Sequence, residues 1–136
     1  MKMALEGVRV VEWGLFMQGP VAARILGSLG AEVIKIEDPR RGDPSRHVKS
    51  LSGVSLEMAD GRCAFYENHN RSKKGIAVDL KKPEGKEIVY RLVRESDIFI
   101  QNWRPGLAER LGVDYETLRK HNPKLIYGSG SGYGPL

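Results

Sequence analysis

The chain has 136 residues, of which 40% are hydrophobic and 29% are charged, and 22 lysines and arginines against 17 aspartates and glutamates give a formal net charge of +5. This is the composition of one soluble globular domain with its own core, and the basic balance suits either an anionic partner or an ordinary solvated surface. A single cysteine, Cys63, excludes an internal disulfide, and no apolar run approaches the ~20 residues of a membrane helix, so we expect a cytoplasmic protein.

The first part of the chain predicts a βαβ unit. Residues 8–13 (VRVVEW) and 31–37 (AEVIKIE) are apolar, β-branched runs typical of buried strands. Between them, Gly19-Pro20 is expected to open a helix with proline at its first position, and Gly30 to stop it. Strands joined in this way are parallel, and a ligand is expected beyond their carboxyl ends.

The middle of the chain is less regular. Residues 38–62 are rich in Pro, Gly, Ser and Arg without a period, which predicts a long loop that is functional or mobile. A short helix is expected over 63–69, and 70–74 (NRSKK) are expected to form a basic turn. That turn leads into a third strand at 75–80.

The last part predicts helices at 83–93, 107–111 and 115–121, with strands at 97–102 and 124–128 between and after them. Five strands interleaved with helices predict an α/β fold, a Rossmann-like, doubly wound and mainly parallel sheet of about five strands. The glycine-rich tail SGSGYGPL follows a strand and the sequence then stops. We therefore expect residues 1–136 to be the N-terminal portion of a longer protein, or a truncated product.

Familiar catalytic motifs are missing. The sequence has no P-loop, no HExxH and no GxSxG, and the tail is either a phosphate-binding loop or a flexible end. The histidines His47, His69 and His121 lie far apart without metal-ligand spacing, so we expect no metal site and assign them surface or capping roles. Cys63 is expected to be buried and structural.

Basic and aromatic residues follow three of the predicted strands. Lys81 follows the third strand, residues 102–104 (NWR) the fourth and residues 131–133 (SGY) the fifth, so parallel pairing is expected to gather them at one sheet edge. Arginine and lysine for charge, with an aromatic face for stacking, suit a ligand that has phosphates and a flat base. Nucleic acid would need one basic stripe with interleaved aromatics, which is not seen, and solvated faces account for many of the other charges.

Five segments of the chain resemble the family III CoA-transferases. These are LEGVRVVEWG, GPVAARILGSLGAEVIKIEDPRRGD, NRSKKGIAVDLKKPEGKE, SDIFIQNWRPGLAERLGVDYETL and NPKLIYGSGSGYG, which cover nearly the whole chain in order. The family is the CaiB/BaiF group, which includes formyl-CoA transferase, carnitine CoA-transferase and α-methylacyl-CoA racemase.

The resemblance implies an enzyme of acyl-CoA metabolism that moves coenzyme A from an acyl-CoA to a carboxylic acid. In that family an aspartate attacks the thioester, giving a mixed anhydride and then an aspartyl-CoA thioester. It also implies an interlocked homodimer, CoA or acyl-CoA as substrate with no tightly bound cofactor, and no nucleic-acid or membrane partner. The nucleophilic aspartate is expected beyond Leu136, so this chain alone is expected to be inactive.

The resemblance also places CoA contacts on this sequence. Lys81, Arg104 and Arg110 are expected to hold the phosphates, and Gly132 and Tyr133 to line the thioester end. The full set of expected contacts is Met17, Gln18, Val78, Lys81, Asn102, Trp103, Arg104, Arg110, Ser131, Gly132, Tyr133 and Gly134. Two alternatives stay open: an acyl-CoA racemase of the same superfamily, and a non-catalytic CoA- or nucleotide-binding module. The sequence does not define the acyl donor or acceptor.

Overall fold

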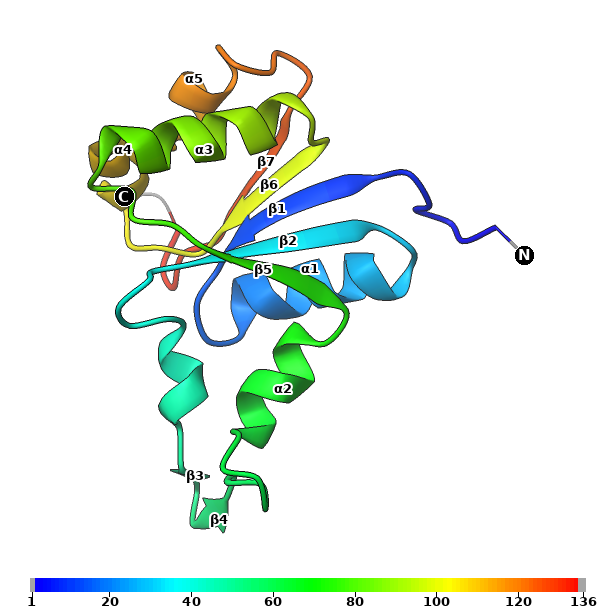
Figure 1. Cartoon of the computed structure of the whole chain (residues 1–136), viewed down its shortest axis with the longest axis vertical. Helices are drawn as coiled ribbons and strands as arrows, with labels where there is room; N and C mark the ends of the chain where they lie inside the picture. The colour runs from blue at the N-terminus through cyan, green and yellow to red at the C-terminus, as the bar shows by residue number, and fades with distance from the viewer. Residues whose placement is uncertain (1, 135–136) are drawn as a thin grey trace.

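The computed structural model describes residues 2–134, and its centre is a five-stranded sheet whose neighbouring strands all pair in parallel (Figure 1). The strands are β1 (Arg9–Trp13), β2 (Glu32–Glu37), β5 (Lys73–Ala77), β6 (Ile98–Gln101) and β7 (Ile126–Ser129). They lie in the order β5-β2-β1-β6-β7. The first strand is therefore central and the chain winds outward in both directions, which confirms the predicted Rossmann-like fold.

The helices cover both faces of the sheet (Figure 1). One face carries α1 (Gln18–Ser28) and α2 (Ala64–Asn70), and the other carries α3 (Pro83–Arg94), α4 (Leu107–Leu111) and α5 (Tyr115–Leu118). Neighbouring strand residues alternate between the two cores, as the period of a strand requires. Val10 packs with Ala23 of α1, whereas Val11 packs with Val89 and Val93 of α3.

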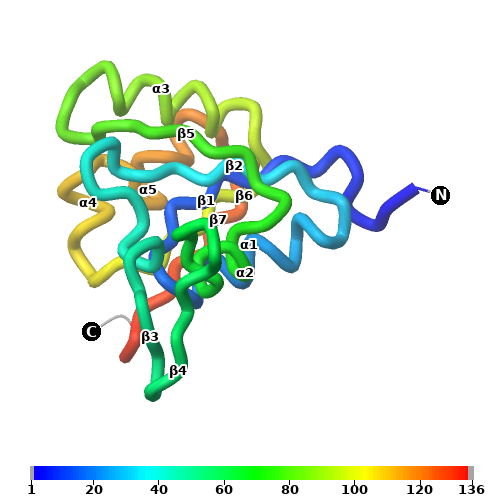
Figure 2. Tube along the Cα trace, turned by 60° about the horizontal axis from the view of Figure 1, so that its bottom comes forward, coloured from blue at the N-terminus to red at the C-terminus, as the bar shows by residue number. Residues whose placement is uncertain are grey.

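Residues 38–62 form an arm with little regular structure, as the sequence predicts. Within it are a 3-10 helix, η1 (Pro44–His47), and a small antiparallel hairpin made by β3 (Ser50–Leu51) and β4 (Val54–Ser55). The hairpin projects away from the sheet (Figure 2). Two-residue strands are too short to leave a periodic signal, which is why the sequence reads as loop throughout.

Several boundaries differ from the predictions, and the strand predicted at 75–80 ends earlier, at Ala77. Strand β5 begins at Lys73, inside the predicted basic turn, because Lys73 pairs in register with Val33 of β2 and its ammonium finds a carboxylate there. Helix α1 begins at Gln18, so Pro20 is its third residue and not its first. Helix α5 ends at Leu118, before the predicted end at 121.

The lone thiol and one histidine are buried. Cys63 is buried, as expected, and its Sγ donates to the carbonyl oxygen of Val48 at 3.1 Å. His69, which is predicted to have a surface or capping role, is not at the surface: it is buried, with Nδ1 2.6 Å from the carbonyl oxygen of Phe65 and its ring against the Phe65 ring.

No helix within residues 2–134 combines the length and the apolar character needed to cross a bilayer.

Candidate functional site

The sheet has its topological switch point between β1 and β6. The chain leaves β1 toward α1 on one face and leaves β6 toward α4 on the other, so the two loops diverge at the carboxyl edge of the sheet (Figure 1). Crevices at such points are the usual ligand sites of doubly wound sheets. Here the crevice lies between residues 14–17 and 102–106.

A cleft of about 500 Å³ occupies this crevice. Five of the expected CoA contacts come together in it: Met17, Gln18, Asn102, Trp103 and Arg104. The remaining lining residues are Leu15, Phe16 and Leu107. The walls are therefore largely apolar, and one guanidinium stands at the cleft for an anionic group.

The first wall of the cleft is held by side chains. Gly14 donates its N–H to Glu12 Oε1 at 2.6 Å, and its carbonyl oxygen accepts from Lys35 Nζ at 2.9 Å. Phe16 donates its N–H to Asp43 Oδ1 at 3.2 Å. These contacts satisfy loop backbone groups that would otherwise need water, and they fix the loop from β1, β2 and the segment after β2.

The charges behind this loop form what we call the buried cluster, made of Glu12, Lys35, Asp43 and Lys73. Lys35 Nζ lies 3.1 Å from Glu12 Oε1 and 3.0 Å from Asp43 Oδ2, and Lys73 Nζ lies 3.0 Å from Glu12 Oε2. Each of these side chains is 2% exposed or less. Two cations face two anions, so the cluster is electrically balanced.

Burial and pairing move two pKa values in the cluster. Burial lowers the pKa of Lys73 to about 8, although Glu12 acts in the opposite direction. Burial alone would raise the pKa of Asp43, but attraction to Lys35 and hydrogen bonds from Ser45 leave it below its ordinary value. Asp43 is therefore an anion at neutral pH and can accept the N–H of Phe16.

A second ion pair ties the arm to the end of β2. The Arg46 guanidinium donates to both oxygens of the Glu37 carboxylate at 2.8 Å, and Tyr66 donates its hydroxyl to Glu37 Oε1 at 2.7 Å. Burial opposes ionisation of Glu37, yet these bonds lower its pKa to about 2. Glu37 Oε2 also accepts the N–H of Asp43 at 2.7 Å, which links this pair to the buried cluster.

The second wall of the cleft follows β6. Gln101 donates from Nε2 to Ser129 Oγ at 2.7 Å and accepts the N–H of Trp103 through Oε1 at 2.7 Å. The Trp103 ring is buried and lies edge-on to Trp13, with ring centroids 5.3 Å apart. Trp103 thus offers no open face to a flat base, and its position in the cleft wall comes from core packing.

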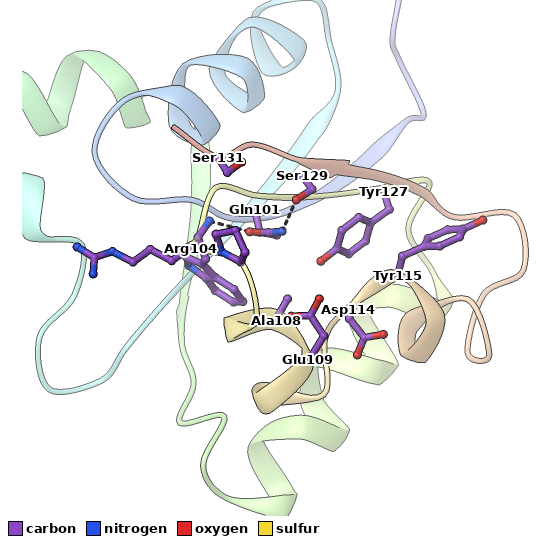
Figure 3. Close-up of a pocket in the computed structure, with 12 residues that line it drawn as sticks. Gln101, Arg104, Ala108, Glu109, Asp114, Tyr115, Tyr127, Ser129 and Ser131 are labelled. Atoms are coloured by element: carbon purple, nitrogen blue, oxygen red, sulfur yellow. Dashed lines mark hydrogen bonds between the residues drawn. The ribbon is translucent and has the colours of Figure 1, made fainter. Parts of the chain in front are cut away.

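A second cavity of about 290 Å³ lies beside the cleft, between the end of the sheet and helices α4 and α5 (Figure 3). Tyr127 points its hydroxyl toward this cavity, and the carboxylates of Glu109 and Asp114 lie near it. Arg104 borders it but extends its guanidinium away from it (Figure 3). An acidic rim is unsuitable for phosphates, so we place the candidate site in the first cleft.

The other expected contacts do not line that cleft. Val78 is a buried core residue, and Lys81 is exposed beyond β5, which β2 and β1 separate from β6. Arg110 is exposed on α4, one turn after Leu107 and so on the same side of the helix. Ser131 lines the second cavity, whereas Gly132, Tyr133 and Gly134 line neither, and Tyr133 is 96% exposed. The roles of all these residues stay predictions.

Sequence reasoning missed the buried cluster, although a signal was present. Glu12 and Lys35 are charged residues inside apolar strands, and they face each other directly in the β1–β2 register. Arg9 and Glu32 form a second such pair, 2.6 Å apart. Opposite charges at matched positions of adjacent strands predict a cross-strand ion pair once the pairing is assumed. Among residues 2–134, no group of three or more His, Cys, Asp or Glu side chains is placed to hold a metal ion.

Comparison with known proteins identifies relatives along nearly the whole chain. The family model for CoA-transferase family III matches residues 5–136. A succinate–glutarate CoA-transferase from Agrobacterium fabrum is 46% identical over 137 residues, covering 98% of this chain and 33% of the relative. A formyl-CoA:oxalate CoA-transferase from Afipia carboxidovorans is 35% identical over 135 residues, covering 99% of this chain and 30% of the relative.

A solved structure has the same fold. The crystal structure of a CaiB/BaiF family protein from Brucella suis superposes with a TM-score of 0.82 at 38% identity, over 95% of this chain and 33% of that one. The chain thus spans about a third of the length of the relatives that it matches.

Proposed function

The chain belongs to CoA-transferase family III, and from this premise we propose that it forms a coenzyme A binding part of an enzyme that transfers CoA from an acyl-CoA to a carboxylic acid. One observation carries the proposal. Five residues expected to contact CoA line a single cleft at the switch point of the sheet. They come from two segments that are 84 or more residues apart in the sequence, so only the fold brings them together.

The chemistry of the cleft suits the two ends of the ligand. Phe16 and Met17 are exposed in the first wall and Leu107 lies in the second, which gives apolar surface for the pantetheine arm. Arg104 at the cleft, and Arg110 on the side of α4 that carries Leu107, supply guanidinium groups for phosphate oxygens.

The proposed reaction is covalent catalysis by an aspartate carboxylate. The carboxylate attacks the acyl-CoA thioester, which forms a mixed anhydride and releases the CoA thiolate. The thiolate then attacks the aspartyl carbonyl of the anhydride, which forms the aspartyl-CoA thioester and releases the donor acid as its carboxylate. The acceptor acid repeats these steps in reverse. Asp79, Asp97 and Asp114 match no nucleophile position of the family, so we propose that the nucleophile follows residue 136 in the complete gene product.

Calorimetry with CoA tests the binding proposal. Arg104→Ala and Arg110→Ala each remove a charged donor, and we expect each to weaken CoA binding by about 10- to 100-fold. Arg62→Ala is the matched control, because Arg62 is exposed on the arm and pairs with Asp60 and Glu67. Unchanged affinity in both test variants would remove the two arginines from the site, and no binding by the unmodified protein would refute the proposal.

Activity assays separate the enzymatic alternatives. We expect the complete gene product to transfer CoA from succinyl-CoA to a dicarboxylic acid, as the names of a succinyl-CoA–L-malate and a succinyl-CoA–D-citramalate CoA-transferase among its relatives suggest for those proteins. Exchange of the α-proton of a 2-methylacyl-CoA without transfer would instead indicate a racemase. We also propose a homodimer, which light scattering on the purified gene product would detect.

A further inference from the structure

Phe16 has an unusual backbone conformation at the mouth of the cleft. Its φ of 60° lies in the left-handed region, which a residue with a bulky side chain rarely adopts, and the residue is 46% exposed. Such a conformation persists only where the surroundings determine it more strongly than the local preference does.

The surroundings of this loop are side chains that reach it from several elements. The three successive N–H groups of Gly14, Leu15 and Phe16 are donated to Glu12, Asn102 and Asp43, respectively. The carbonyl oxygens of Gly14 and Leu15 accept from Lys35 and Asn102. Five consecutive backbone polar groups thus depend on side chains.

Stability alone does not explain the buried cluster. Removing four charges from water is costly, and apolar side chains of similar volume often stabilise a core as well as a buried ion pair does. Apolar side chains cannot, however, form hydrogen bonds with the backbone of the loop. Lys35 bonds the carbonyl oxygen of Gly14 while pairing with Asp43, and Asp43 in turn bonds the N–H of Phe16.

We propose that Lys35 and Asp43 are positioning residues, which hold the Gly14–Phe16 loop in its binding conformation before any ligand arrives. They touch no cleft surface themselves and act through the loop, which places Phe16 and Met17 in the cleft wall. Because the loop is already ordered before binding, ligand binding does not have to supply the free energy of ordering it. The inference rests on the proposed function only for the identity of the ligand, CoA.

The test uses a charge-balanced double variant, Lys35→Met with Asp43→Asn. It removes one cation and one anion together, so Glu12 keeps Lys73 and no uncompensated charge is left in the core. The matched control is Asp97→Asn, whose carboxylate also accepts a backbone N–H, from Arg9 at 2.8 Å, but at the opposite edge of the sheet. Two readouts are measured: amide hydrogen exchange of the ligand-free protein, and CoA affinity well below the melting temperature.

We expect exchange at Gly14, Leu15 and Phe16 to rise by about tenfold or more in the double variant while amides of β1 and α3 stay protected, and CoA affinity to fall by a similar factor. The control should change neither. Unchanged exchange at the loop would overturn the inference. A uniform rise over the whole sheet would also overturn it, because that result indicates a purely structural role.

The proposed ligand and the proposed positioning role can fail independently, and the two measurements distinguish these cases. If the unmodified protein does not bind CoA, the proposed ligand is wrong, but the exchange measurement on the free protein still decides the role of the cluster. If the double variant does not fold, Lys35→Ile with Asp43→Asn gives the same comparison. It also removes one cation and one anion, a β-branched side chain suits strand β2, and the carboxamide keeps the Oδ1 acceptor for Ser45. Selective exposure of the loop supports the inference, and an unchanged loop refutes it.

Discussion

The side-chain amide of Asn102 closes two hydrogen bonds on the backbone of Leu15, 87 residues earlier in the chain. Its Oδ1 accepts the N–H of Leu15 at 2.7 Å, and its Nδ2 donates to the carbonyl oxygen of Leu15 at 2.9 Å. These two bonds satisfy the backbone of Leu15 as a neighbouring strand would, just beyond the ends of β1 and β6. They join the two walls of the cleft, so the shape of the cleft depends on this amide as well as on the buried cluster.

Replacing this amide by a carboxylate should therefore open the cleft. In Asn102→Asp an oxygen replaces the donor and faces the Leu15 carbonyl oxygen, so we expect a loss of about 1–3 kcal/mol in the free energy of unfolding, measured with urea. CoA affinity should fall as well. Asn68→Asp, on the exposed side of α2, makes the same chemical change and should alter neither quantity. Wild-type stability in Asn102→Asp would show that water can replace the missing donor.

Acid should weaken the contact between the arm and β2. The pKa of Glu37 is about 2 in the folded protein against an ordinary 4.5, so its contribution to stability is present above pH 4.5 and is lost as pH falls toward 2. The difference corresponds to roughly 3 kcal/mol. In urea titrations from pH 7 to pH 2.5, Glu37→Gln should flatten this decline. Glu57→Gln, at an exposed site, should leave the decline as it is.

Gly85 marks a close approach between helix α3 and the chain that leads into it. A Cβ at this position would collide with the carbonyl oxygen of Asp79. Gly85→Ala should therefore cost about 1–3 kcal/mol of stability through a forced backbone shift. Gly75 in β5 has open space around its position, so Gly75→Ala is the comparison and should stay within about 0.5 kcal/mol. Equal stability of the two variants would indicate that α3 shifts without cost.

The left-handed conformation of Phe16 gives a prediction from two variants at one position. Phe16→Gly and Phe16→Ala both remove the ring, but only glycine adopts a φ of 60° without strain. We expect the glycine variant to be more stable by about 1 kcal/mol, measured by thermal unfolding. At Ile25, in the middle of α1, the same pair should have the opposite order, because glycine weakens a helix. A more stable alanine at position 16 would show that the loop adopts another conformation in solution.

The sequence predicts the five strands because each is a short apolar run between glycine, proline or polar residues. It predicts parallel pairing because helical segments separate those runs. Local pattern does not define the order of the strands in the sheet, however. Lys81 and Arg104 both follow strands, yet β5 lies at one edge of the sheet with β2 and β1 between it and β6. A basic residue after a strand can therefore lie far from the cleft.

The sequence does not predict which charged and polar side chains bind other parts of the protein and not a ligand. Lys73 looks like a surface lysine in a basic turn, but it lies in β5 and its ammonium reaches Glu12 and the carbonyl oxygen of Pro20. Asn102, which is predicted to contact the ligand, also bonds the backbone of Leu15 with both ends of its amide. Such roles depend on contacts between residues that are distant in sequence, and no single-segment pattern contains them.

The burial of Lys35 and Lys73 has a chemical consequence for a protein that we propose to handle acyl thioesters. A neutral amine attacks thioesters, and a pKa of about 8 leaves part of Lys73 neutral at physiological pH. The ammonium groups behind the cleft are nevertheless only 2% exposed. These two lysines are thus shielded from accidental acylation by the fold itself.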